Sequence, residues 1–301
     1  MTAPSTARPI GRAFAGALFA VVVWGGSFVA TKVALRQVEP MTVIWLRFGI
    51  GVAVLALAVA RRHDFFFPSV RELARFVGLG AIGITLHQLL QVIGLVTARA
   101  STTSWIITAT PLTMALVGRI VLKERLRWRQ IAGIAIGAAG VLLVVSRGDW
   151  GALTRGSFGS IGDLLVAMST LTWTLFSVYS RQSLQRRAAA PMILYVVGSG
   201  WLLGTIPWVL SGGPSQIAQL TVSGWTAIAF LGVMCSGLAY VFWYDALKVL
   251  PTATVGSMLY LEPIVTMGVA AAVLGESITL WALLGGAVIL AGVRAATARE
   301  A

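Results

Sequence analysis

The sequence has little charge, little histidine and almost no cysteine. Only 11% of its 301 residues are Asp, Glu, Lys or Arg, whereas 57% are hydrophobic and the mean hydropathy is +0.87. A soluble domain carries roughly 25% charged residues, so the composition predicts an integral membrane protein. The single cysteine, Cys235, lies in an apolar run and carries no information on disulfides or redox compartment.

The scarcity of histidine argues against an enzyme. The only two histidines, His63 and His87, form no His/Asp/Glu cluster with the spacing of a metal site. Neither a G-x-S-x-G elbow nor a P-loop is present. An intramembrane hydrolase would have only His87 and a nearby serine such as Ser27 for its chemistry. We therefore expect no enzyme activity, no cofactor and no bound metal.

The formal net charge is +13, from 23 Lys and Arg against 10 Asp and Glu. Nucleic-acid binding would need these cations clustered on one solvated face. They stand instead between the apolar runs. We therefore expect the lipid bilayer, and no nucleic acid, as a partner.

Uncharged runs of about 20 residues can cross a hydrocarbon core of about 30 Å as helices. Ten such spans can be recognised, joined by loops too short for a separate soluble domain. The spans lie between Arg12 and Lys32, at 41–60, between Arg75 and Arg99, Arg99 and Arg119, Arg129 and Arg147, and Asp163 and Arg181, on either side of the SGGPSQ turn within 188–244, and at 252–274 and 279–293.

The basic residues also predict the orientation. With the N-terminus inside, 17 of the 23 Lys and Arg fall on the cytoplasmic side and five in the outer loops. Both termini are therefore expected in the cytoplasm. Arg47 alone remains within a span, where it either extends past Trp45 to the outer interface or pairs with a carboxylate of the protein or of a ligand.

The two halves of the chain repeat each other. A shift of 152 residues aligns Pro111 with Pro263 and Glu124 with Glu276, and a shift of 149 aligns Trp24 with Trp173. We predict a first five-helix repeat at 1–147, an outer linker at 148–162 and a second repeat at 163–301. Because five is odd, the second repeat enters the membrane inverted. The predicted fold is all-α, with ten transmembrane helices as two inverted five-helix repeats around a central cavity, a plan of many secondary transporters.

Several motifs resemble those of a known family. WGGSF at 24–28, LRFG at 46–49 and the paired blocks TPLTMALVGRIVLKERLRWRQIAGIAIGAAGV and EPIVTMGVAAAVLGESITLWALLGGAVILAGV are similar to EamA-domain proteins of the drug/metabolite transporter superfamily. The aromatic-rich spans are most similar to the YddG-type aromatic amino-acid exporters. The resemblance implies a monomeric exporter of the bacterial inner membrane that moves aromatic or other hydrophobic amino acids and related metabolites.

Two alternatives stay open. Relatives in the superfamily carry phosphorylated metabolites or nucleotide sugars, but such anions need Lys or Arg in the cavity, and only Arg47 lies at depth. A lipid scramblase or a receptor is not excluded by the sequence, although an inverted repeat favours alternating access.

Proline and glutamate interrupt the apolar runs at matched positions. A proline within a helix removes a backbone donor and displaces the carbonyl four residues back, that of Ile107 for Pro111 and of Leu259 for Pro263. These prolines are candidate hinges, with a simple packing kink as the alternative. Glu262 is a candidate for coupling transport to protons, because a carboxylate at membrane depth is costly unless it is paired, hydrated or neutral.

Deep aromatic and neutral polar side chains on matched helices predict the substrate site. They suit a ligand with an apolar or aromatic body and a small polar head, although ordinary helix packing would account for any one of them. The candidate residues are Trp24, Ser27, His87, Gln88, Gln91, Trp105, Thr108, Trp173, Tyr240, Trp243 and Tyr260.

Two further features indicate structure more than chemistry. Gly133, Gly137, Gly140, Gly285 and Gly292 are predicted to be positions of close helix packing. Glu124 and Glu276 lie just before the next helix, where they are expected to order a loop or a helix N-terminus.

Overall fold

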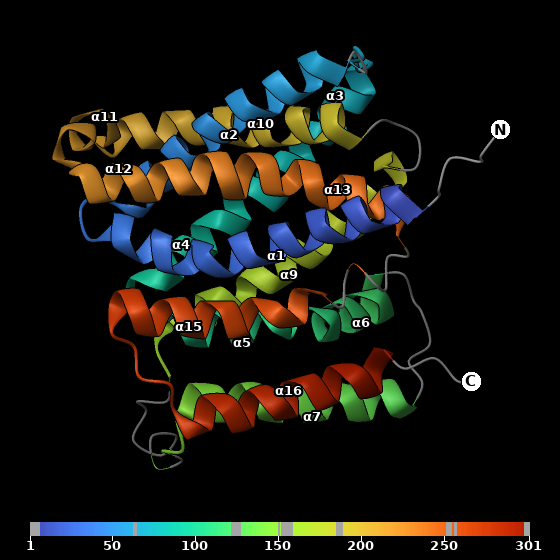
Figure 1. The fold of residues 1–301 in the computed structure, drawn as a ribbon, viewed down its shortest axis with the longest axis vertical. Helices are drawn as coiled ribbons and strands as arrows, with labels where there is room; N and C mark the ends of the chain where they lie inside the picture. The colour runs from blue at the N-terminus through green and yellow to red at the C-terminus, as the bar shows by residue number, and fades with distance from the viewer. Residues whose placement is uncertain are drawn as a thin grey trace.

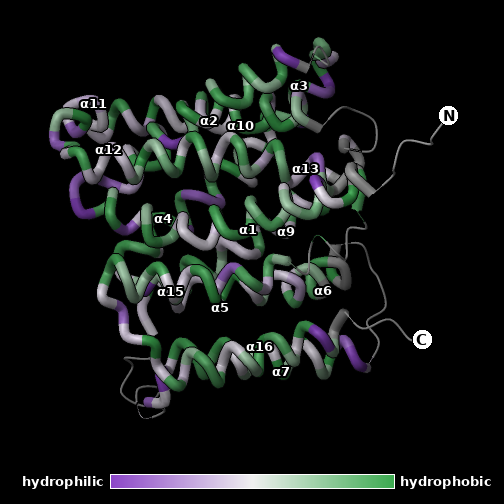
Figure 2. The backbone as a smooth tube through the Cα atoms, viewed as in Figure 1, coloured by the Kyte–Doolittle hydropathy of each residue, from purple (hydrophilic) through white to green (hydrophobic). Residues whose placement is uncertain are grey.

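The computed structural model describes residues 7–62, 65–121, 128–149, 151, 159–184, 189–250, 255 and 258–297. Every regular element in these ranges is helical, as the composition predicts. The helices are stacked side by side with their axes roughly aligned, and α1 begins at the end of the molecule where α16 finishes (Figure 1). Figure 2 shows mostly hydrophobic residues along the helices and hydrophilic residues gathered near their ends.

The first half contains a long α1, a long α2 and a third rod in which α-helix and π-helix alternate. The elements are α1 (Ala7–Leu35), α2 (Pro40–Arg62), α3 (Val70–Gly80), the π-helix η1 (Ala81–Leu86), α4 (His87–Thr97), α5 (Ala100–Thr108), α6 (Thr110–Val121) and α7 (Trp128–Ser146).

The second half has the same order of long and interrupted helices. Its elements are α9 (Ile161–Leu184), α10 (Ala189–Leu210), α11 (Gly213–Gln216), η2 (Ile217–Gln219), α12 (Val222–Ala229), the π-helix η3 (Phe230–Leu238), α13 (Ala239–Val249), the 3₁₀ turn η4 (Leu259–Leu261), α15 (Glu262–Leu274) and α16 (Leu280–Thr297).

Seven helical segments of the described ranges are long and apolar enough to cross a membrane. They are Ile10–Leu35, Pro40–Arg61, Val70–Thr97, Trp128–Ser146, Ile161–Ser180, Ala190–Leu210 and Val222–Ala246. The sequence predicts ten spans, and the remaining three positions hold shorter helices. The fourth span is divided into α5 and α6, and the last two correspond to the apolar helices Leu259–Leu274 and Leu280–Ala295.

The helix boundaries follow the sequence repeat. The third rod of each half runs from residue 70 to 97 and from 222 to 249, so both ends differ by 152 positions. α1 and α9 end at 35 and 184, a difference of 149. The π-helices η1 and η3 end at residues 86 and 238, again 152 apart. The two halves therefore share irregular as well as regular elements.

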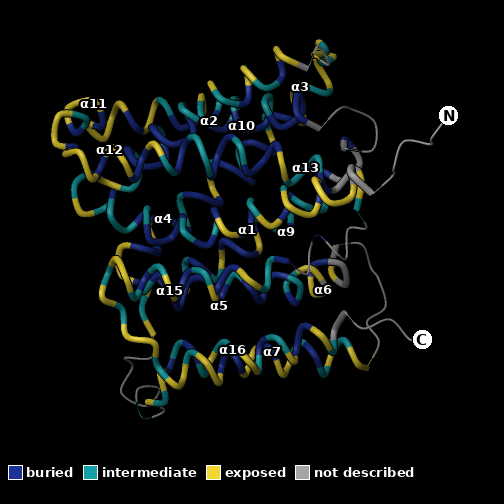
Figure 3. The backbone as a smooth tube through the Cα atoms, in the orientation of Figure 1, coloured by how far each residue is buried: buried dark blue, intermediate teal, exposed yellow. Residues whose placement is uncertain are grey.

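α1 lies at the centre of the bundle and packs against helices of both halves, including α13 and α15. Its glycines allow this close contact. A Cβ atom at Gly25 would lie 2.9 Å from the Glu262 backbone oxygen and 2.8 Å from Val265 Cβ. Most exposed residues lie on the outer helices, and much of α1 is buried (Figure 3).

α7 and α16 form a closely packed pair at one edge of the bundle (Figure 1). A Cβ atom at Gly140 would lie 2.8 Å from the Gly285 oxygen, and one at Gly292 would lie 2.7 Å from the Gly133 oxygen. The predicted role of these glycines in helix packing is confirmed, because larger side chains would separate the two backbones.

Candidate functional site

Arg47 is the only described arginine side chain that is both buried and within a span. It is 5% exposed and comes from α2. Its Nε donates to Ser236 Oγ of η3 at 3.1 Å, and its Nη1 donates to Gln88 Oε1 of α4 at 3.1 Å. Arg47 also lies over the Phe48 ring, 5.1 Å from its centroid. It therefore does not extend to the outer interface but joins three helices in the interior.

The Arg47 guanidinium has no carboxylate partner among the described residues. Arginine has five N–H donors and stays charged in proteins. Two donors are used, both by neutral acceptors, so the fork formed by Nη1 and Nη2 keeps free donors. A buried cation of this kind is costly unless a counter-charge reaches it.

Three predicted aromatic residues come together beside this cation. The Trp24 ring lies 5.8 Å from Tyr240 in an edge-to-face arrangement and 5.1 Å from Trp243. Trp24 Nε1 donates to the Cys235 backbone oxygen at 3.1 Å. Trp24 and Arg47 thus contact consecutive residues of η3, whose Cα atoms are about 3.8 Å apart.

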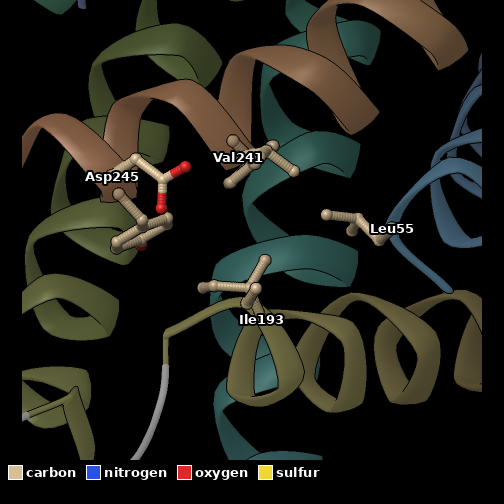
Figure 4. A pocket seen from close by; sticks show the side chains of 7 residues that line it. Leu55, Ile193, Val241 and Asp245 are labelled. Atoms are coloured by element: carbon tan, nitrogen blue, oxygen red, sulfur yellow. The ribbon is translucent and has the colours of Figure 1, made fainter. Parts of the chain in front are cut away.

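A small pocket with an enclosed volume of about 10 Å³, room for about one water molecule, lies next to this region. It is lined by Leu55, Ala190, Ile193, Tyr240, Val241, Tyr244 and Asp245. Leu55, Ile193 and Val241 face one another from α2, α10 and α13 (Figure 4). Tyr240 belongs both to this pocket and to the aromatic group with Trp24, so it connects the two.

His87 and Trp173 form a separate contact between α4 and α9. Their rings lie 5.2 Å apart, and His87 Nδ1 lies 3.0 Å from the Ser169 backbone oxygen and 3.4 Å from Thr172 Oγ1. Among the described contacts, His87 and Ser27 form no hydrogen bond with each other.

Ser27 and Gln91 are buried, yet their side chains have no hydrogen-bond partner among the described residues. They come from α1 and α4, two helices in contact. Both groups are therefore available to a polar ligand atom or to water.

The remaining predicted site residues lie elsewhere. Trp105 belongs to a second apolar cluster with Met267 and Ile289, and Tyr260 packs against that cluster. Thr108 Oγ1 donates within its own helix to the Ser104 oxygen at 2.8 Å. The structure therefore places Trp105 and Tyr260 in a different cluster from Trp24 and Tyr240.

Both candidate hinge prolines lie at the start of a helix. α5 ends at Thr108 and α6 begins at Thr110, while η4 precedes α15, so each proline stands in a first turn where its missing N–H is not needed. The two carbonyls expected to be displaced have partners. The Ile107 oxygen accepts from Thr110 Oγ1 at 2.5 Å, and the Leu259 oxygen accepts from the Glu262 N–H.

Glu262 is 8% exposed, at the first turn of α15 against α1. Its carboxylate forms no hydrogen bond or ion pair with a described residue. Glu262 and Arg47 form no hydrogen bond or ion pair with each other.

A polar clasp closes the end of the bundle where α1 finishes. Glu276, just after α15, accepts from the Ala100 N–H at 2.9 Å, the Ser101 N–H at 3.2 Å and Ser101 Oγ at 2.6 Å, and it lies 3.6 Å from Arg99 Nε. Burial favours a higher pKa for this carboxyl group, but these hydrogen bonds and the Arg99 charge outweigh burial and lower its pKa. Lys32 Nζ donates nearby to the Leu95 and Ala98 oxygens.

The predicted role of Glu276 in ordering a helix N-terminus is confirmed, but at a different helix. It caps α5 of the first half and not the following helix, α16. The matched Glu124 lies outside the described residues.

Sequence reasoning left Arg47 and Ser236 out of the candidate site. Arg47 had a signal, because it is the only arginine within a predicted span. No sequence signal marked Ser236 as a functional residue, since a lone serine in an apolar helix often forms a hydrogen bond with its own backbone.

The repeated halves, the helix breaks at matched prolines and the buried polar site agree with a comparison against known families. The sequence profile of the EamA-like transporter family matches residues 12–146 and again residues 160–297. The chain belongs to the EamA-like transporter family. It is therefore a multi-pass membrane protein of a transporter family.

Relatives of this EamA chain include proteins described as amino-acid exporters. A probable terminal-alkyne amino-acid exporter of Streptantibioticus cattleyicolor is 28% identical over 91% of this chain and 89% of its own length. A probable amino-acid metabolite efflux pump of Salmonella typhimurium is 28% identical over 92% of both chains. An uncharacterized transporter of Archaeoglobus fulgidus is 28% identical over 93% of this chain and 95% of its own.

A solved crystal structure has the same fold. Its chain is 22% identical to this EamA chain, with a TM-score of 0.64 over 95% of this chain and 96% of the other. At this identity the likeness concerns the fold alone.

Proposed function

We propose that this protein exports aromatic or other hydrophobic amino acids and related small metabolites across the bacterial inner membrane by alternating access. The observation that carries the proposal is the contact of half-buried Trp24 and Trp243 with buried Tyr240, which also lines the pocket. Aromatic walls next to a few polar groups suit a ligand with an apolar body and a polar head. The relatives described as amino-acid exporters point to the same substrate class.

Alternating access needs a site that is closed toward one side of the membrane and open toward the other. The Glu276 clasp lies at one end of the bundle, and the pocket lies among α2, α10 and α13 toward the opposite end. With both termini in the cytoplasm, the pocket would face the cytoplasm and the clasp the outside. We propose that this arrangement is an inward-facing state of two inverted five-helix repeats in a monomer.

Transport into proteoliposomes tests the function directly. A panel of labelled amino acids, sugars and phosphate esters is offered to purified protein, with and without a pH gradient. We expect aromatic and large hydrophobic amino acids to be transported and to compete with one another. Transport of phosphate esters alone would reject the amino-acid proposal in favour of phosphorylated metabolites. Empty liposomes provide the control for leakage of hydrophobic substrates.

A further inference from the structure

We propose that Arg47 binds the carboxylate of the transported ligand, with Gln88 and Ser236 holding the guanidinium in place. This inference rests on the proposed function, because it assigns the polar head of the ligand at the same site. The chemical class it predicts is an aryl or hydrophobic carboxylate whose apolar body packs against Trp24, Tyr240 and Trp243.

The first support is the unsatisfied cation itself. Arg47 is 5% exposed, and both of its hydrogen bonds go to neutral oxygens. Neutral partners and the neighbouring Phe48 ring offset only part of the cost of a buried charge. A carboxylate supplies the missing charge and matches the planar fork of a guanidinium with two parallel hydrogen bonds.

The second support is the number of free donors on the guanidinium. Nε is used by Ser236, and Nη1 has one of its two N–H groups on Gln88. One N–H group of Nη1 and both of Nη2 are therefore left for a ligand carboxylate.

The third support is the distance between the cation and the aromatic group. Arg47 bonds to Ser236, and Trp24 bonds to Cys235, the preceding residue of η3. Tyr240 packs edge-to-face against Trp24 and lines the pocket. In an aromatic amino acid the carboxylate carbon and the ring are separated by three bonds. One small ligand can therefore contact both groups.

The fourth support is the asymmetry of the two halves. The shift of 149 residues places Val196 at the position of Arg47, and Val196 is fully buried in the apolar core. The repeated architecture is thus built without a cation at this position of the second half. A role for Arg47 in folding alone would leave its uncompensated charge without explanation.

The test compares ligands that differ only in their charged groups. L-phenylalanine, 3-phenylpropionate, which lacks the amine, and L-phenylalaninamide, which lacks the carboxylate, compete with labelled phenylalanine in proteoliposomes. The same three compounds are tested for thermal stabilisation of the purified protein in detergent, a readout that needs no transport. The variants are Arg47→Gln and Arg47→Lys, with Arg61→Gln, an exposed arginine of the same helix, as the matched control.

We expect phenylalanine and 3-phenylpropionate to compete and to stabilise wild-type protein, and the amide to do neither. Arg47→Gln should lower the affinity for phenylalanine and for 3-phenylpropionate by at least about tenfold, the usual effect of removing one partner of a buried charge pair. Arg47→Lys keeps the charge but loses the fork, so it should retain part of the affinity. It serves as the informative variant if Arg47→Gln fails to fold. Arg61→Gln should match wild type.

The outcomes separate this inference from the proposed function. If Arg47→Lys or a folded Arg47→Gln still discriminates carboxylate from amide as wild type does, the carboxylate role of Arg47 is wrong, even where phenylalanine is transported. If no amino acid is transported but 3-phenylpropionate stabilises the protein through Arg47, the carboxylate site is supported and the amino-acid function is rejected.

Discussion

Trp24 is the residue on which the aromatic part of the proposed site depends. Its ring contacts Tyr240 and Trp243, and its indole N–H is bonded to a backbone oxygen of η3. Replacing Trp24 with Ala should therefore raise the KM for an aromatic amino acid by more than about tenfold, since losing a buried aromatic contact costs about 2 kcal/mol or more. Transport kinetics in proteoliposomes measure this change.

Trp281 provides the control for Trp24. It lies near the start of α16 and is 37% exposed. Trp281→Ala should leave KM unchanged and alter, at most, the yield of folded protein. Equal KM values for the two variants would show that Trp24 is a packing residue.

Glu262 is the second residue whose role can be tested alone. A buried carboxylate without a partner among the described residues can take up and release a proton during transport. We expect Glu262→Gln to abolish any dependence on a pH gradient, while exchange of substrate for substrate continues, since exchange need not release the proton. Counterflow and gradient-driven uptake measure the two processes separately. Gradient dependence that survives in Glu262→Gln would assign the proton to another group.

At the scale of elements, the helix breaks at Pro111 and Pro263 are the candidates for movement. Alanine at either position restores an N–H donor and allows the two segments to join as one α-helix. We expect the maximal transport rate to fall several-fold while the substrate affinity changes by less than about twofold. The reason is that conformational changes, and not binding, often limit the turnover rate of a protein. Pro214→Ala, at the first turn of α11, is the matched control. Unchanged rates in both hinge variants would leave the breaks as packing features.

The Glu276 clasp predicts a pH-dependent stability. Its pKa is lowered in the folded protein, so its contribution is fully present above the ordinary pKa of a glutamate and is lost as the pH falls through the lowered value. Glu276→Gln should reduce Tm near neutral pH by about 2–4 °C, as expected when a helix cap worth about 1 kcal/mol is lost.

Thermal unfolding in detergent, measured from neutral to acidic pH, checks this prediction. The difference between wild type and Glu276→Gln should shrink as the pH falls. Glu72→Gln in the exposed capping box of α3 is a control, because it changes a cap outside the clasp. A difference that stays constant with pH would contradict the role of the ionised carboxylate.

At the scale of the whole molecule, the charge distribution predicts the orientation in the membrane. Cysteine at Ser211, an exposed position after α10, should react with an impermeant maleimide from outside intact cells, and cysteine at Phe67 should react only after lysis. The native Cys235 is fully buried and should give little background. Reversed labelling, or labelling of both positions in intact cells, would reject a single orientation with both termini inside.

The sequence by itself determined that this protein folds in a lipid bilayer, the order of its helices and the register of its repeat. Apolar runs, glycine positions and shifts of 152 and 149 residues are local or periodic signals, and the helix ends follow them. The breaks near Pro111 and Pro263 were also predictable, because proline acts on its own backbone. The π-helices before His87 and Tyr240 were not, since no single residue type specifies them.

Only the tertiary structure decided which polar and aromatic side chains meet. Trp24, Tyr240 and Trp243 share one group, whereas Trp105 and Tyr260, which the sequence placed with them, pack in another cluster. The sequence of its own helix did not decide whether Arg47 extends to the membrane interface or binds a partner inside the protein. Its two hydrogen bonds are made to residues 41 and 189 positions away in the chain. Such contacts depend on how helices from distant parts of the chain pack, which a helical period within one segment does not encode.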